Sequence, residues 1–259
     1  MSGQLPDLGS IPMIFTIACK ELKTLFASPL AWTLLALMQL VLAWVFLGRL
    51  DAFLEIQSQL LQIANPPGVT EIIVAPAFAM AAVVLLMATP LLTMRLIAEE
   101  RRNHTMTFLI SAPISMTDIV LGKFLGLMIF FCSVIVLVAV LALSLLTGGA
   151  LDIGLLLSNI AGLLLICACF AALGLYISCL TAQPAIAAAG TLGALLGLWV
   201  VDIAADDADS IMRNLSLLKH YESFNRGMID TFDLAYFALF ILLFLVMAIR
   251  RLDGERLRG

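Results

Sequence analysis

Long apolar stretches separated by short polar segments run along most of the chain. The stretches without a charged residue are Leu30–Gly48, Ile72–Met94, Phe124–Leu151, Ile153–Val201 and Leu234–Ile249. A membrane-spanning helix needs about 20 mostly apolar residues, and a charge at its centre costs about 2.5–3.5 kcal/mol. Each of these stretches therefore predicts at least one transmembrane helix.

The stretch Ile153–Val201 is too long for a single span. As one helix it would measure about 74 Å at 1.5 Å per residue, against a hydrocarbon core of about 30 Å. Residues 181–184, Thr-Ala-Gln-Pro, interrupt it with polar groups and a proline, and proline does not continue a helix. We therefore predict an all-α membrane protein with six transmembrane helices in residues 30–250, preceded by a cytoplasmic segment (1–29) and followed by a cytoplasmic tail (251–259).

Residues 11–27 are amphipathic at helical spacing. Ala18, Leu22 and other apolar residues share one stripe, whereas Lys20 and Lys23 lie on the opposite stripe. A helix of this kind lies in the membrane interface with its apolar side toward the lipid. We predict an N-terminal interfacial helix on the cytoplasmic side. No small-residue cleavage pattern follows the first span, so we expect that span to remain in the mature protein.

Composition excludes several classes of protein. Hydrophobic residues make up 63% of the chain and charged residues 12%, against about half and about a quarter in soluble domains. Too little polar surface remains for a soluble enzyme or a nucleic-acid-binding module, and the apolar content excludes a disordered chain. The formal net charge of −4 also argues against a nucleic-acid surface.

Basic residues indicate the orientation in the membrane. Six spans place both termini on one side, and cytoplasmic segments carry the excess of Lys and Arg. Ten of the 14 basic residues fall on the side of the termini, and the other four are Arg49, Arg213, Lys219 and Arg226. Both termini are therefore predicted to be cytoplasmic.

The segment between the second and third spans predicts a short helix held between them. Its first half is charged, from Glu99 to Arg102, and its apolar second half ends at Pro113. Ser115-x-x-Asp118 is then a capping pattern that begins the third span. Such a helix can pass motion from a soluble partner into the membrane; an ordinary charged inner loop is the alternative interpretation. Lys123 follows about two turns into the span, and we expect its side chain to extend back to the lipid headgroups.

The residues predict no metal or nucleotide site. Cys167 and Cys169 point about 200° apart on a helix and cannot hold one metal together. A phosphate-binding loop needs G-x-x-x-x-G-K-[S/T], but Gly122-Lys123 is followed by Phe124 and preceded by Thr117 at the first glycine position. We expect no cofactor in this chain, and any ATP-derived energy must come from a separate chain.

Two pairs of glycines predict close contact between helices. The pairs are Gly122 with Gly126 and Gly193 with Gly197, each separated by three residues. Small residues at this spacing let two helices approach closely in a membrane. The pattern fits packing within one chain and packing between two copies equally well.

Two stretches resemble a known family. The first is Ala98-Glu-Glu-Arg-Arg-Asn-His-Thr-Met-Thr-Phe-Leu-Ile-Ser-Ala-Pro-Ile-Ser, followed by Asp118-Ile-Val-Leu-Gly-Lys-Phe. It resembles the signature of the type-2 ABC exporter permeases, although His104 and Thr107 stand where that signature has Gly and Glu. The second, residues 215–230 followed by 233–237, is similar to the outer loop before the last span in the gliding-motility-type and nitrous-oxide-reductase-maturation-type permeases.

The resemblance implies a permease subunit of an exporter in a bacterial inner membrane. In that family, the interfacial helix and the inner helix rest on a separate ATPase subunit that binds ATP and Mg, and two permease chains, here a homodimer, surround a central path. The residues expected to couple to the ATPase are Glu99, Glu100, Arg101, Arg102 and Thr105, supported by Lys20 and Lys23. Those expected to contact a periplasmic or membrane-anchored accessory partner are His220, Tyr221, Phe224 and Arg226.

Three other functions compete with export. A complex of this type can pass force to a periplasmic partner without moving a solute. A proton-coupled secondary transporter usually carries charges at mid-membrane, and the nearest here is Asp202, at the outer end of the fifth span. An intramembrane enzyme is disfavoured because His104 and His220 lie on opposite sides and neither H-E-x-x-H nor G-x-S-x-G is present. The nearly uncharged path suits lipids, peptides or glycans alike.

Overall fold

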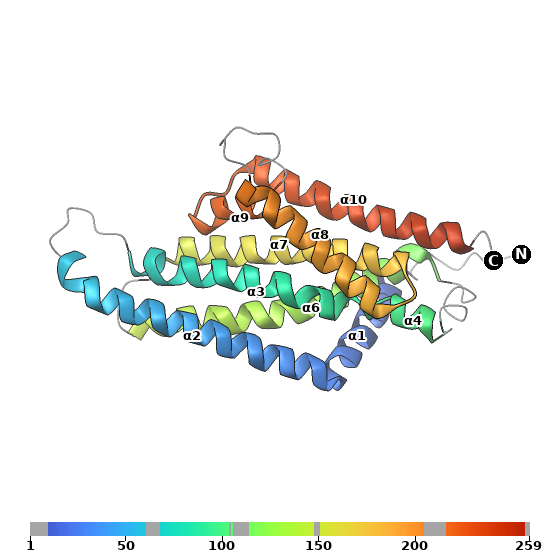
Figure 1. The fold of residues 1–259 in the computed structure, drawn as a ribbon, viewed down its shortest axis with the longest axis horizontal. Coiled ribbons are helices and arrows are strands. Elements are labelled where there is room, and N and C mark those ends of the chain that lie inside the picture. The colour runs from blue at the N-terminus through green and yellow to red at the C-terminus, as the bar shows by residue number, and fades with distance from the viewer. Residues whose placement is uncertain are drawn as a thin grey trace, which may run out of the picture.

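The computed structural model describes residues 10–60, 68–103, 105, 114–147, 151–204 and 216–256, in which every regular element is a helix. Most of the long helices lie lengthwise in one bundle, and α8 crosses it obliquely (Figure 1). Shorter helices lie at its two ends, α4 at one and α9 at the other, which we call the α4 end and the α9 end. The long helices are α2 (Pro29–Leu60), α3 (Ala75–Thr93), α6 (Met116–Leu143), α7 (Ile153–Leu180), α8 (Pro184–Ala204) and α10 (Thr231–Arg256).

The remaining elements are shorter or lie across the bundle. Helix α1 (Ser10–Ala27) crosses the α4 end, α4 spans Ala98–Arg102, and α9 spans Leu217–Asn225. A π-helical turn, η1 (Thr70–Val74), leads into α3, and a 3₁₀ turn, η2 (Ser144–Thr147), follows α6. Helix α1 covers the whole of the predicted N-terminal helix, residues 11–27. Its placement at a membrane surface stays a prediction.

In the part of the chain that the structure describes, five segments are long and apolar enough to cross a membrane, which agrees with a multi-pass membrane protein. They are Pro29–Gln57, Thr70–Arg102, Met116–Leu146, Ile153–Leu180 and Thr231–Arg256. The predicted break is present, because α7 ends at Leu180 and α8 begins at Pro184. The apolar part of α8, Pro184–Val200, is shorter than the other five. The sixth span therefore stays a prediction.

Side-chain caps explain where several helices begin. The Ser115 hydroxyl accepts a hydrogen bond from the Asp118 N–H at 3.0 Å, which is the capping pattern predicted for the third span. Asp152 caps α7 in the same way, with its carboxylate 3.1 Å from the Leu155 nitrogen. The charged half of the predicted inner helix is α4; its apolar half, residues 106–113, lies outside the described residues, as do His104 and the side chain of Asp202.

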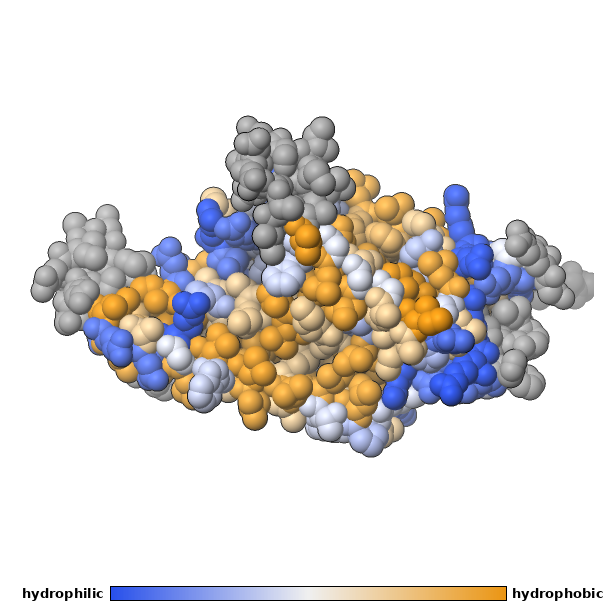
Figure 2. All heavy atoms as spheres, in the orientation of Figure 1, coloured by the Kyte–Doolittle hydropathy of each residue, from blue (hydrophilic) through white to orange (hydrophobic). Residues whose placement is uncertain are grey.

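The core lies around α7, which packs against α3, α6, α8, α9 and α10. Large buried rings fill it, including Phe78, Phe130, Phe131, Phe170 and Phe237. Many leucines are exposed on the outside of the bundle, as are Trp32 and Trp44. Figure 2 shows hydrophobic residues as a broad band between two more hydrophilic ends on the face in view. A band of this kind matches the hydrocarbon layer of a membrane.

The two glycine pairs differ in what they face. A Cβ atom at Gly122 would lie 2.7 Å from the Cβ of Ile17, and one at Gly126 would lie 3.0 Å from the carbonyl oxygen of Ala18. This pair therefore lets α1 pack closely along α6 within one chain. Gly193 and Gly197 on α8 have nothing within 4 Å of such a Cβ. No described residue covers their face of α8.

Candidate coupling site at the α4 end

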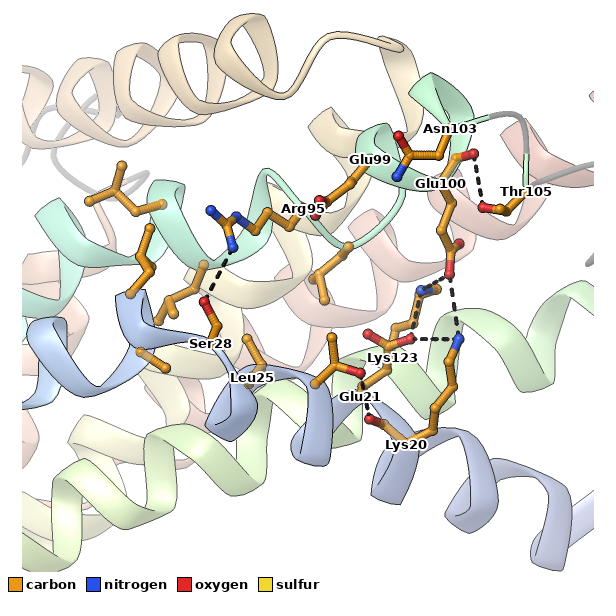
Figure 3. Close-up of a pocket in the computed structure, with 16 residues that line it drawn as sticks. Lys20, Glu21, Leu25, Ser28, Arg95, Glu99, Glu100, Asn103, Thr105 and Lys123 are labelled. Atoms are coloured by element: carbon orange, nitrogen blue, oxygen red, sulfur yellow. Dashed lines mark hydrogen bonds and ion pairs between the residues drawn. The ribbon is translucent and has the colours of Figure 1, made fainter.

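A buried lysine joins three helices at the α4 end. Lys123 on α6 is 2% exposed, and its Nζ lies 2.9 Å from Glu21 Oε1 on α1 and 2.8 Å from Glu100 Oε1 on α4 (Figure 3). Lys20 adds a second cation at 3.7 Å from Glu21 and 3.9 Å from Glu100. We call these four residues the Lys123 cluster. Its two cations and two anions neutralise one another. Such pairing offsets the free energy of removing the charges from water.

A second ion pair ties α4 to the last helix. Arg101 Nη2 lies 2.7 Å from Glu255 Oε2 on α10, and both side chains are largely buried. Arg251 approaches the same carboxylate group at 3.5 Å. The backbone N–H groups of Ile97 and Ala98 donate to the hydroxyl oxygen of Ser178 at the end of α7, at 3.2 and 3.1 Å. A helix of only five residues is thus fastened to α1, α6, α7 and α10.

The structure divides the predicted coupling residues into two groups. Glu100 and Arg101 are used in ion pairs within the chain. Arg102 and Thr105 are exposed beyond them, and the Thr105 hydroxyl donates to the carbonyl oxygen of Glu100 at 3.2 Å. Glu99 is half-buried, and Lys20 and Lys23 are exposed on α1.

Sequence reasoning missed the centre of this site. Lys123 does not extend to lipid headgroups as expected, because two carboxylates lie within hydrogen-bond distance of its ammonium group. Glu21 received no role. The available signal was its position: a lone acid on the mostly apolar α1, three residues after Ala18, which faces Gly126.

A cavity of about 280 Å³ lies beside the Lys123 cluster. Figure 3 shows Arg95, Glu99 and Asn103 along one side of it and Ser28, Glu21 and Lys20 along the other. The guanidinium group of Arg95 donates to the hydroxyl oxygen of Ser28 at 3.3 Å. Its apolar wall includes Leu30, Ala31, Leu91 and Leu92.

At the α9 end, three of the four predicted partner-contact residues face inward. His220 is 3% exposed, and its Nδ1 lies 2.6 Å from Asp233 Oδ1 on α10. Its ring stacks on that of Tyr236, with 4.0 Å between centroids. Tyr221 and Phe224 are also buried, whereas Arg226 is exposed and paired with Glu222. Of the four, only Arg226 is open to a partner without rearrangement of α9.

Helix α9 is packed tightly onto α7. A Cβ atom at Gly162 would lie 2.5 Å from the Cβ of Phe224. The Ser158 hydroxyl donates to the Phe224 carbonyl oxygen at 2.8 Å. Burial raises the pKa of Tyr221 well above its usual value. The α9 end is therefore tightly packed against α7.

No group of three or more His, Cys, Asp or Glu side chains within the described ranges is placed to hold a metal ion.

The chain matches the profile of a family described as "ABC-2 family transporter protein" over residues 15–256. The match extends from α1 to the end of α10 and so includes both ends of the bundle. A search of curated proteins gives no match.

Proposed function

We propose that this chain, which belongs to the ABC-2 family of membrane transporters, is the permease subunit of an exporter driven by a separate ATPase. The supporting observation is the fastening of α4 to four other helices by the Lys123 cluster, the Arg101–Glu255 pair and Ser178. A push on α4 reaches α1, α6, α7 and α10 together.

The exposed residues around α4 form the proposed docking surface for the ATPase. Arg102 and Thr105 lie on the α4 side, and Lys20 and Lys23 lie on α1. Because α1 and α4 are joined through Lys123, an ATPase that contacts both would move them as one body. Both termini are proposed to be cytoplasmic, which places this surface in the cytoplasm of a bacterial inner-membrane protein with six spans. The ATPase subunit would bind ATP and Mg.

A second permease copy completes the proposed complex. The open face of α8 around Gly193 and Gly197 supports close approach by another helix, because no part of the described chain fills it. Two copies would then enclose a path along their shared face. Passing force to an outer partner remains the competing function. Transport into sealed inside-out vesicles distinguishes the two, because only an exporter accumulates a solute there.

The test of coupling uses Arg102→Glu rather than a change in the buried ion pairs. The tagged chain is purified with its ATPase, and ATP hydrolysis by the complex is compared with that of the ATPase alone. We expect Arg102→Glu to reduce the stimulation about tenfold, the effect of losing about 1.4 kcal/mol of coupling. The thermal unfolding of the chain should not change.

Arg49→Glu is the matched control, since it reverses an equally exposed arginine far along α2 from α4. Full stimulation by Arg102→Glu, or an equal loss in Arg49→Glu, would count against α4 as the coupling surface.

A further inference from the structure

The cavity at the α4 end contains two opposite charges that no described residue neutralises. Within the described residues, neither Arg95 nor Glu99 has an ion-pair partner, although both line this cavity. Among the described residues, the Arg95 guanidinium donates to the Ser28 hydroxyl alone. The neighbouring charges of the Lys123 cluster are already balanced. A ligand in the cavity therefore meets one available cation and one available anion.

The cavity lies at the edge of the apolar band. Arg95 follows the end of α3, and Ser28 precedes the start of α2, so both lie where helices leave the apolar band. Leu91, which is exposed, and Leu30 continue the wall into that band. Trp32 is exposed one turn further along α2, with its indole N–H donating to the carbonyl oxygen of Phe26. Tryptophan is enriched at the boundary between headgroups and hydrocarbon.

We propose that this cavity binds the phosphoethanolamine headgroup of a membrane lipid. The phosphate would accept hydrogen bonds from Arg95 and Ser28, and the ammonium group would donate to the Glu99 carboxylate. Such bonds between charged groups are the strong ones in proteins. The acyl chains would lie against Leu30 and Leu91.

Charge and volume favour this headgroup over the alternatives. A phosphocholine group has no N–H to donate to Glu99. An anionic headgroup would leave Glu99 unpaired and close to negative charge. The volume of about 280 Å³ is just below the range of about 300–1,000 Å³ for pockets that hold whole small ligands. It accommodates a headgroup and leaves the lipid tails outside.

A lipid bound here would add a contact that the protein alone lacks. It would join the end of α3, the turn between α1 and α2, and the start of α4. This inference goes beyond the proposed function, since it concerns binding by the permease alone.

The experiment titrates the purified full-length chain in detergent with phosphatidylethanolamine, phosphatidylcholine or phosphatidylglycerol of identical acyl chains. Native mass spectrometry measures the lipid bound per chain. We expect phosphatidylethanolamine to bind about tenfold more tightly than the other two, the effect of one additional charge-assisted hydrogen bond. Equal binding of phosphatidylcholine or phosphatidylglycerol would overturn the proposal.

Variants assign the two charges separately. Glu99→Gln should abolish the preference for phosphatidylethanolamine, and Arg95→Gln should weaken binding of all three lipids about tenfold. Arg250→Gln and Asp253→Asn, which remove exposed charges on α10 at the same end, should bind as the unaltered chain does. A preference retained in Glu99→Gln, or lost equally in the control variants, would overturn the assignment.

A soluble competitor separates a lipid from a free phosphoester. Glycerophosphoethanolamine carries the headgroup without acyl chains, and we expect it not to displace the bound lipid at equal concentration. Displacement at that concentration would show a soluble ligand and overturn the lipid assignment. No ATPase or nucleotide is present, so these results do not depend on whether the chain drives export.

Discussion

Different kinds of interaction stabilise the two ends of the bundle. At the α4 end, charged side chains from α1, α4 and α6 meet around Lys123. At the α9 end, the His220–Asp233 pair lies among aromatic rings, and Phe224 packs against the backbone at Gly162. Long charged side chains can follow a small shift of a neighbouring helix, whereas a glycine–ring contact leaves no room for one. We therefore expect α4 to shift more readily than α9.

Removing the central cation should give the largest effect. Lys123→Met leaves the carboxylates of Glu21 and Glu100 without their main partner in a buried site. Breaking a buried ion pair on one side costs about 3–5 kcal/mol. We expect the free energy of unfolding to fall by that amount, measured by denaturation in detergent.

A triple variant provides the control for Lys123. Adding Glu21→Gln and Glu100→Gln removes the charges that Lys123→Met leaves unpaired, so most of the stability should return. If the single variant were as stable as the unaltered chain, the Lys123 cluster would not be what holds the α4 end.

Adding one methyl group tests the rigidity of the α9 end. Gly162→Ala places a Cβ 2.5 Å from that of Phe224, so α9 must move away from α7. Overpacking of this kind costs about 1–3 kcal/mol, which we expect as a lower free energy of unfolding in the same assay.

Gly48→Ala on α2 is the matched control, because a Cβ there meets nothing within 4 Å. It should leave the chain unchanged or slightly more stable, since alanine favours a helix over glycine by about 0.8–1.0 kcal/mol. Equal behaviour of the two variants would show that α9 is not tightly packed on α7.

The glycines of the helices illustrate what the sequence does and does not determine. Apolar runs predicted where the helices lie, the polar segment with Pro184 predicted the break, and the Ser115-x-x-Asp118 pattern predicted the cap. Each of these signals depends on residues close together in the chain. The two small-residue pairs were indistinguishable in the sequence. Only the fold shows that Gly122 faces α1 while Gly193 faces open space.

The candidate site, too, was predictable only where it depends on residues close together in the chain. The charged helix at Glu99–Arg102 was predicted as a unit from its local pattern. Its partners were not predicted, because Glu255 lies 154 residues from Arg101 along the chain and Glu21 lies 102 residues from Lys123. Helical periodicity indicates which face a residue is on, and the neighbour of that face depends on how distant helices pack.

A smaller effect is expected from the polar pair at the α9 end. Asp233→Asn keeps the shape of the side chain but weakens its hydrogen bond to His220. A net loss of about 0.5–1.5 kcal/mol is typical for one hydrogen bond. Thermal unfolding in detergent measures this loss. Asp253 is an exposed residue on the same helix, so Asp253→Asn should show no loss. A loss in Asp233→Asn larger than that in Gly162→Ala would mean that polar contacts rather than packing hold this end.

The smallest change in stability is expected at Arg226. Arg226 and Arg101 each pair with a glutamate, but the Arg226 side chain is 65% exposed and that of Arg101 is 15% exposed. Exposed pairs contribute little because water screens them. Arg226→Gln should therefore change the free energy of unfolding by less than about 0.5 kcal/mol, whereas Arg101→Gln should cost clearly more in the same denaturation assay. If an accessory partner docks at the α9 end, Arg226→Gln should weaken its binding without this loss of stability, because the Arg226 side chain contacts solvent rather than the core. The two variants change the same residue type in the same kind of ion pair. Equal destabilisation by both would therefore contradict the proposed difference between the two ends.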